Sequence, residues 1–523
     1  MVLLVPLRAV ISFSVIPQHQ RSSVTAAFRQ EHRPRSCLAG SITTSGTSVK
    51  LAMTASASNK KTVAVIGGGI AGLSCANALL SSGRFLPTVF DTGRLRPGGR
   101  CASRLPNDRA KEDKDANNNS KSNRGILGST IIDHAAQILT IPSGYSEFRA
   151  QVEQWEREGI VKKFKEGSVC SIGNPVNPKT KQHDKSKLRV QPMKGDMYYG
   201  INGMQSIPMT MVRGVDVQQD VWVSPSNGVR LVKSQGGEKW EVKAKGKVMG
   251  QFDRLVIAHN GKCADRLMST TPAKDFHRLL QVNFAPFVPR DGGSKMTLNS
   301  LYSLSFALPA DSALSKTLSH DDHFVCGFIK NHVNLRFISC NTRKHATTTT
   351  DNEQHEHVEV WTILSSAKFG KQYKGAQENL PDELVEQVTG LLLKSLEESL
   401  ILPPGSLIRD PATTSSSRHG SNGCVMESRL QLWGAGVPLN TWIPMSHAND
   451  DDDDDAVRGF LYDSHYSVGA CGDWLLESSV AGAWESGRRL AEFMATDPTL
   501  SVGLQGKFQA SSAVDKVGIG SLS

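Results

Sequence analysis

The pattern of apolar and polar positions is most regular between residues 62 and 91. An apolar run from Thr62 to Ile66 predicts a buried strand. A segment rich in small residues, from Ala71 to about Ser82, predicts a helix. A second apolar run, Pro87 to Phe90, predicts another strand, and Asp91 stands at its end. The order strand, helix, strand predicts the first unit of a parallel α/β sheet.

Three glycines stand between the first strand and the helix in G-x-G-x-x-G spacing. Gly67 suits the tight turn out of the strand, and Gly69 lets the backbone approach a pyrophosphate. Gly72 lets the helix and strand pack closely. The pyrophosphate would then bind the N–H groups of the first helical turn, which includes Ile70 and Ala71, where the helix dipole favours negative charge.

An acidic residue at the end of the second strand completes this pattern. Asp91 follows Gly72 by 19 residues, and its carboxylate can accept hydrogen bonds from ribose hydroxyls. A carboxylate at this place would repel a 2′-phosphate, which argues against NADP. Strand, glycines, helix, strand and acid in register predict a dinucleotide site.

Two further segments bear on which dinucleotide binds. The run Arg96–Ser103 has the order R-x-G-G-R-x-x-S. Its glycines, Gly98 and Gly99, let the backbone run against a cofactor, and Arg100 can neutralise a phosphate or order the loop.

The second of these segments lies near the other end of the chain. Residues 467–474 predict a strand that ends in Gly472 and Asp473. An amphipathic helix is predicted to follow through about Met494, with Val480 and Gly482 near its start.

These motifs together resemble the renalase-like branch of the FAD-dependent amine-oxidase-type oxidoreductases, which includes plastid members, over residues 60–496. The resemblance implies that Asp473 binds the ribityl–phosphate part of FAD and that Val480 to Gly482 lie near the pyrimidine edge of the flavin. It also implies that the last helix points its N-terminus at the ring, where the dipole stabilises the anionic reduced flavin. The expected cofactor is FAD, bound non-covalently.

Weaker matches lie between the two ends of the chain. Residues 132–137 and 199–204 resemble the D-x-G-A-Q segment and the G-x-x-G-M turn of renalase-like proteins, although Ala135 replaces a glycine. Residues 221–223, which include Val223, fit the strand whose backbone contacts adenine. Residues 252–258 fit the strand where the cofactor-binding region resumes.

The expected fold class is α/β: a Rossmann-like FAD-binding domain of the three-layer glutathione-reductase type, with an inserted α+β substrate domain built on an antiparallel sheet. The FAD-binding domain is expected over residues 59–140, 200–265 and 425–496. The substrate domain is expected over 141–199 and 266–424. Within it the pattern predicts strands at 300–308, 324–329, 333–339 and 358–365, a long helix at 380–402, and polar insertions at 173–187 and 342–357.

Residues 1–58 have the composition of a targeting segment. They are rich in Ser, Thr and Ala and hold six basic residues against one acid, Glu31. The expected destination is the plastid, with the mitochondrion as the alternative and a merely disordered N-terminus as the third interpretation. Residues 497–523 are expected to form a loose tail.

The N-terminal segment contributes half of the net charge of +10, so the rest of the chain has an ordinary charge and no basic-aromatic block typical of nucleic-acid binding. No run of 18 apolar residues occurs, so no membrane span is expected.

Nine cysteines without a C-x-x-C pair predict neither a disulfide framework nor a zinc site. His355 and His357 lack neighbouring ligands, and the aspartates at 450–455 lack the glycine turn of a calcium loop, so no metal is expected.

The expected function is transfer of a hydride from an amine or a reduced-nicotinamide-like small molecule to flavin N5, with oxygen or another acceptor reoxidising the flavin. The sequence identifies no catalytic base; His134, His259 and His465 are candidates because they adjoin matched segments. Two alternatives stay open. One is a flavoprotein-fold binding or assembly factor with structural or no FAD, and the other is an NAD-dependent dehydrogenase.

Overall fold

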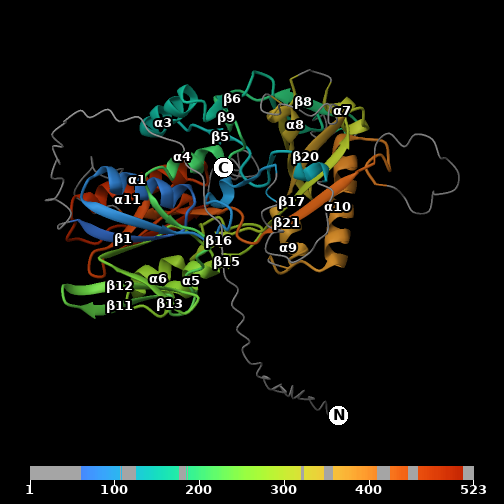
Figure 1. Ribbon diagram of the computed structural model, residues 1–523. Coiled ribbons are helices and arrows are strands. Elements are labelled where there is room, and N and C mark those ends of the chain that lie inside the picture. The colour runs from blue at the N-terminus through green and yellow to red at the C-terminus, as the bar shows by residue number, and fades with distance from the viewer. Residues whose placement is uncertain are drawn as a thin grey trace, which may run out of the picture. The chain divides into compact units, whose positions relative to one another are not determined.

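The computed structural model describes residues 60–106, 108, 125–175, 184, 186–319, 323–346, 357–377, 379–408, 424–445 and 458–510 (Figure 1). The predicted targeting segment at 1–58, His355 and the aspartate run at 450–455 lie outside these residues.

A six-stranded sheet contains the strands predicted around the glycine motif. Its order is β10 (Asp216–Gln218), β2 (Phe85–Phe90), β1 (Lys61–Ile66), β14 (Arg254–Ile257), β24 (Val468–Cys471) and β23 (Phe460–Asp463). The first five strands are parallel, and β23 runs antiparallel to β24. Helix α1 (Ile70–Ser81) joins β1 to β2, which confirms the predicted strand–helix–strand unit.

Successive side chains of β1 point to opposite faces of this sheet and enter two separate cores. Val63 and Val65 pack in a cluster with α1 and with α11 (Val480–Ala495). Ala64 and Ile66 pack in a second cluster that includes a three-stranded antiparallel sheet and two helices. These elements are β11 (Val229–Ser234), β12 (Gly237–Ala244), β13 (Lys247–Phe252), α5 (Lys262–Ser269) and α6 (Lys274–Leu280). Because β1 is buried on both faces from Val63 to Ile66, these four residues are continuously apolar rather than alternating.

A seven-stranded sheet forms the second large element. Its order is β21 (Glu427–Trp433), β17 (Leu301–Pro309), β20 (Val358–Ser365), β19 (Leu335–Cys340), β18 (Cys326–Ile329), β7 (Val169–Gly173) and β8 (Arg189–Pro192). All pairs are antiparallel except β18 with β7. Helix α10 (Asp382–Leu400) shares a buried cluster with β17 and lies beside it in Figure 1. The four strands and the long helix predicted from the pattern are confirmed, with their ends shifted by a few residues.

The remaining strands pair in small groups: β3 (Ser103–Arg104) with β4 (Ile132–Asp133), β5 (Leu139–Thr140) and β6 (Val161–Lys163) with β9 (Met197–Gly200), β15 (Val282–Phe284) with β16 (Met296–Leu298), and β22 (Asn440–Pro444) with β25 (Gly506–Ala510). The other helices are α3 (Ser146–Arg157), α4 (Ser206–Met211), α7 (Ala313–Leu318), α8 (Asn341–Lys344) and α9 (Ala367–Gln372), with short 3₁₀ turns at Gly99–Cys101 (η2), Ile126–Gly128 (η4) and Asp473–Leu475 (η7).

Residues 221–223 form no named strand, which corrects the sequence prediction. Val223 makes only an isolated bridge to Ala244, and the adjacent strand of the six-stranded sheet is β10. The backbone of Asp220 has a φ of +53°, which is incompatible with an extended strand, so the chain turns before Val221.

Two other segments differ from their predicted placement. Strand β21 was expected in the cofactor-binding region, but it pairs with β17, because Leu432 joins the buried cluster of the seven-stranded sheet. Residues 506–510 were expected in a loose tail, but they form β25, where Phe508 packs on Trp442 with ring centroids 4.9 Å apart. The domain boundaries otherwise stay a prediction.

Within the described ranges, no helix has both the length and the apolar character needed to cross a bilayer. The same residues contain no group of three or more His, Cys, Asp or Glu side chains placed to hold a metal ion.

Candidate functional site

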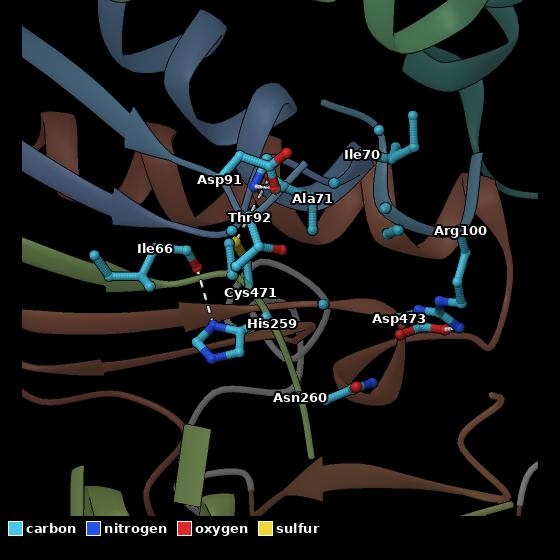
Figure 2. Close-up of a pocket in the computed structure, with 18 of the residues that line it drawn as sticks. Ile66, Ile70, Ala71, Asp91, Thr92, Arg100, His259, Asn260, Cys471 and Asp473 are labelled. Atoms are coloured by element: carbon cyan, nitrogen blue, oxygen red, sulfur yellow. Dashed lines mark hydrogen bonds and ion pairs between the residues drawn. The ribbon is translucent and has the colours of Figure 1, made fainter. Parts of the chain in front are cut away.

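A cavity of about 330 Å³ lies where β1, β2 and β14 end, at the carboxyl edge of the six-stranded sheet (Figure 2). This edge is where open α/β sheets bind ligands. Twelve of the predicted cofactor-binding residues line it: Gly67, Gly69, Ile70, Ala71, Asp91, Gly98, Gly99, Arg100, Val223, Gly472, Asp473 and Val480. The other two, Gly72 and Gly482, do not line it.

The glycines of the first motif have different physical roles. Gly67 has a φ of +116°, which favours glycine. A Cβ on Gly72 would lie 2.0 Å from the carbonyl oxygen of Gly67, so glycine is needed there for packing between helix and turn. A Cβ on Gly69 would meet no protein atom within 4 Å. The absence of a side chain at Gly69 therefore leaves space free in the cavity, whereas the absence of one at Gly72 allows close packing of the protein itself.

The N-terminus of α1 is arranged to receive an anion. Its first flanking residue is Gly69, no side chain caps it, and its first turn holds no acidic residue. The positive end of the helix dipole thus faces the cavity without a competing carboxylate. Helix α11 differs, because Ser479 caps it by accepting a hydrogen bond from the amide of Gly482 at 2.9 Å. Gly482 also lies where a Cβ would be 2.1 Å from the oxygen of Glu477, which explains glycine at this position by packing.

Asp91 is buried beside the glycine turn and organises it. Its Oδ1 accepts from the amide of Gly68 at 3.1 Å, and its Oδ2 accepts from the amide of Gly93 at 3.0 Å. Burial raises the pKa of Asp91 above its ordinary value, although the two amides oppose that shift. A Cβ on Gly68 would lie 2.8 Å from the Asp91 side chain. Sequence reasoning missed Gly68, because the motif treats this position as variable.

Arg100 and Asp473 join the two ends of the chain across the cavity. The guanidinium Nη1 lies 2.8 Å from Asp473 Oδ2 (Figure 2). The same guanidinium donates to the oxygen of Gly436 at 3.1 Å. The Asp473 side chain is 2% exposed and that of Arg100 is 27% exposed. Burial alone would lower the pKa of Arg100, but the Asp473 carboxylate raises it above its ordinary value. This ion pair fixes the position of the Gly98–Gly99 segment relative to β24.

The three candidate histidines take different positions. His259 lines the cavity, but its Nδ1 lies 3.1 Å from the oxygen of Ile66, an interaction in which the ring must donate (Figure 2). Burial lowers the pKa of His259, so this ring is a neutral structural donor. His134 does not line this cavity, and His465 is exposed on the loop before β24. The positions of these three histidines therefore do not identify any of them as a catalytic base.

Several lining residues were not predicted as cofactor-binding. Trp433 is the last residue of β21 and Ala435 follows it, Asn260 follows β14, Cys263 lies in α5, and Ser479 precedes α11. Trp433, Ala435 and Ser479 lie in segments that resemble the family, whereas Asn260 and Cys263 only follow such a segment. Trp433 donates from Nε1 to the oxygen of His134 at 3.1 Å, and the two rings stack with centroids 5.5 Å apart.

Asp133, in the segment that resembles the D-x-G-A-Q motif, is the centre of a buried polar cluster. Its Oδ1 accepts from Ser103 Oγ at 2.5 Å and from the amide of Met204 at 2.8 Å. Its Oδ2 lies 2.7 Å from Lys344 Nζ and 3.2 Å from His345 Nε2. Burial alone would raise the pKa of Asp133, but Lys344 and His345 hold it well below its ordinary value.

Lys344 connects this cluster to the seven-stranded sheet. It stands at the end of α8, between β19 and β20, and its side chain and that of Asp133 are both 0% exposed. Sequence reasoning placed Lys344 in a polar surface insertion at 342–357. For residues 342–344 that was wrong, because Asp133 supplies the buried partner that a lysine charge needs.

Residues 65–150 match the family model described as an NAD(P)-binding Rossmann-like domain. The chain therefore contains a Rossmann-like dinucleotide-binding domain within a mixed α/β fold, as predicted. Among solved structures, it is similar to one described as a protoporphyrinogen oxidase from Exiguobacterium sp. 255-15, with 9% identity over 84% of this chain and 99% of that chain and a TM-score of 0.49. It is also similar to wild-type putrescine oxidase bound to putrescine, with 14% identity over 84% of this chain and 99% of that chain and a TM-score of 0.45.

Proposed function

We propose that this protein is an FAD-dependent oxidoreductase whose flavin accepts a hydride from a small-molecule substrate. One observation carries the proposal: a single cavity is lined both by the first Rossmann unit and by residues from the last elements of the chain, Asp473 and Val480. If the cavity held NAD on the first Rossmann unit alone, residues from the last elements of the chain would not be needed to line it. FAD is longer than the ADP group that the first unit recognises, so residues beyond that unit are needed to hold its flavin end.

The lining residues suit the parts of FAD in turn. The Asp91 carboxylate, oriented by the amides of Gly68 and Gly93, has further lone pairs for the ribose hydroxyls. The uncapped start of α1 and the open space at Gly69 suit the pyrophosphate. Arg100, held by Asp473, suits the ribityl–phosphate part.

When bound without a covalent link, FAD would supply the hydride acceptor. The protein orients that cofactor and shields it from water. Ile66, Phe90 and Leu267 give the cavity apolar walls.

A second candidate is a flavoprotein-fold binding or assembly factor in which FAD is structural or absent. The observation in its favour is the small size of a further cavity that Trp433 also lines. There Arg100, Ala136 and Val437 border a cavity of only about 10 Å³. A space of this size holds about one water molecule, so it has no room for a substrate in this conformation.

Cofactor analysis and anaerobic reduction of the purified full-length protein distinguish these functions. Denaturation should release FAD, identified by its absorbance and mass, and the bound flavin should be bleached anaerobically by an amine or a reduced nicotinamide. Bound FAD that no such donor reduces would favour the binding factor. Tight nicotinamide binding without flavin would favour a dehydrogenase. A folded, colourless protein that ignores added FAD contradicts the proposal.

Replacing Asp91 with asparagine should weaken FAD binding by at least about tenfold. The amide would leave one acceptor oxygen where the carboxylate serves two amides and the ribose. Titration of apoprotein with FAD, followed by flavin fluorescence, measures the affinity. Asp216→Asn is the matched control, because Asp216 is an exposed carboxylate on the neighbouring strand β10. Equal affinities for the two variants would show that Asp91 does not contact the cofactor.

We also propose that residues 1–58 direct the protein to the plastid, with the mitochondrion as the alternative. The proposal is based on their excess of basic over acidic residues and their Ser, Thr and Ala content. Fusing residues 1–58 to a fluorescent protein and locating it by microscopy tests this, and a fusion that stays in the cytosol contradicts it.

A further inference from the structure

Three lysine side chains gather around Phe284, the last residue of β15. Lys371 donates from Nζ to the backbone oxygen of Phe284 at 3.1 Å. The Nζ atoms of Lys374 and Lys262 lie 4.5 Å and 5.7 Å from the centre of the Phe284 ring. The three lysines come from α9, from the turn after it and from the start of α5, so the tertiary structure assembles this lysine cluster (Figure 1).

The charge of the lysine cluster is not neutralised by a described carboxylate. Among the described residues, the three ammonium groups contact only the oxygen and the ring of Phe284, which are both neutral. Burial lowers the pKa of Lys374, and the positive charges of Lys262 and Lys371 lower it further. The one acid of α5, Asp265, contacts His277 at 2.8 Å instead. This surface is therefore electrostatically suited to meet a negative one.

An exposed apolar segment follows the lysine cluster directly in the chain. Residues 285–289 read Ala-Pro-Phe-Val-Pro, and Phe287 is 74% exposed. Phe287 follows Phe284 by three residues, so their Cα atoms are at most about 11 Å apart. A single exposed apolar side chain needs no explanation by itself. Its position beside three unneutralised ammonium groups makes the combination informative.

The loop that carries Phe287 is fixed at its base. Gly292, with a φ of +86°, donates from its amide to the oxygen of Pro289 at 2.9 Å. Asn440 of β22 donates from Nδ2 to the oxygen of Gly292 at 2.8 Å. A Cβ on Gly292 would lie 1.9 Å from the oxygen of Phe508, so the loop packs closely on β25. The exposure of Phe287 is thus a property of a fixed loop.

We propose that the lysine cluster and Phe287 dock the protein on an anionic lipid surface. Lysines are attracted to negatively charged headgroups, and an aromatic side chain between them partitions to the headgroup level. Pro286 and Pro289 have no N–H group, so the loop places fewer unpaired donors at the lipid boundary.

The shape of this surface favours a lipid over an acidic protein as its occupant. A stable protein interface covers roughly 800 Å² on each partner, whereas one projecting aromatic side chain offers much less apolar area. A lipid surface needs no matching contour and accepts such a side chain directly. The docking requires neither flavin nor a helix that spans the bilayer, so it goes beyond the proposed function.

Co-sedimentation of the full-length protein with lipid vesicles tests this docking. Vesicles of phosphatidylcholine mixed with phosphatidylserine should bind the protein at least about tenfold more tightly than vesicles of phosphatidylcholine alone. Added salt should weaken the binding, because it screens the lysines from the headgroups. Equal binding to both kinds of vesicle would overturn the proposal.

Replacing Phe287 tests the apolar part of the docking. Phe287→Ala should bind the mixed vesicles at least about tenfold more weakly, and Phe287→Trp should bind them like the wild type, because tryptophan also suits the headgroup level. Leu500→Ala is the matched control, since Leu500 is 75% exposed in the segment before β25. The proposal is wrong if Phe287→Ala binds no more weakly than Leu500→Ala.

Replacing two lysines tests the electrostatic part. Lys371→Gln with Lys374→Gln should also weaken binding at least about tenfold. Lys233→Gln with Lys247→Gln removes the same charge from exposed positions on β11 and β13 and should bind like the wild type. All variants keep residues 1–58, so binding by the targeting segment is common to them. Equal losses in the two double variants would reveal only an effect of net charge and contradict the docking.

Two further measurements distinguish other occupants of this surface. Isothermal titration with inorganic phosphate should show no binding that depends on Lys371 and Lys374. Saturable phosphate binding that disappears in their double variant would identify a site for a small anion and overturn the proposal. Gel filtration should give the same oligomeric state for the wild type and Phe287→Ala. A change of that state would identify an interface between copies of the chain and would also overturn it.

Discussion

Gly69→Val will leave the protein folded but purified without its dinucleotide. The backbone at Gly69 is extended, with φ −79° and ψ −178°, a conformation that valine adopts readily. A Cβ there meets no protein atom within 4 Å, so the side chain enters the cavity and not the core. It would occupy the space in front of α1 where we place the pyrophosphate. We expect FAD affinity to fall by at least about a hundredfold, or 2.7 kcal/mol.

Flavin content per mole of protein and circular dichroism measure the two parts of this prediction. Gly390→Val is a matched control, because a Cβ at Gly390 also meets nothing within 4 Å but lies on α10. Gly72→Val gives the opposite contrast, since its Cβ would lie 2.0 Å from a backbone oxygen and should impair folding itself. Full flavin content in Gly69→Val would show that the dinucleotide does not pass this point.

Replacing Lys344 with methionine should lower the free energy of unfolding by about 3–5 kcal/mol. The substitution keeps the size of the side chain but leaves the Asp133 carboxylate buried without its ammonium partner. Ser103, Met204 and His345 would still contact the carboxylate, so the lower half of this range is more consistent with the geometry. Urea unfolding measures the change.

Lys163→Met is the matched control, because Lys163 forms an equally short contact with Asp196, at 2.6 Å, but both side chains are about half exposed. Little change is expected there, since water screens the pair. Removing both buried charges, in Asp133→Asn with Lys344→Met, should recover part of the loss. If Lys344→Met were no less stable than Lys163→Met, the buried pair would contribute nothing.

The same pair makes stability depend on pH in a defined direction. The folded state holds the pKa of Asp133 below the ordinary carboxyl value of about 4. Its contribution is therefore present above that ordinary value and is lost as the pH falls toward the depressed folded value. Lys344→Met should show a weaker loss of stability on acidification than the wild type.

Local sequence signals account for the parts of the site that were predicted. The strand, glycines and helix at residues 61–81 are neighbours in the chain, so their spacing alone determines the turn. The R-x-G-G-R motif predicted Arg100 and the Gly-Asp segment predicted Asp473. Neither motif predicted the contact between these two residues, because they lie far apart in the sequence. Gly68 was missed because its constraint comes from the side chain of Asp91.

Other features required the tertiary structure. The polar residues around Lys344 predict a surface position. Nothing near it in the sequence indicates that it forms a buried ion pair with Asp133. Strand β21 alternates polar residues with Leu430 and Leu432, but pattern alone does not tell which sheet it joins.

The ion pair between Arg100 and Asp473 also constrains the order of events during synthesis. During translation the glycine motif, β2 and Arg100 emerge from the ribosome early, whereas Asp473 and α11 emerge only near the end. A nascent chain therefore has one half of the cavity and no partner for its arginine until these last elements fold back. Truncated chains that lack these elements should hold the proposed cofactor less tightly than full-length chains, so the dinucleotide content would report whether the last elements have folded back.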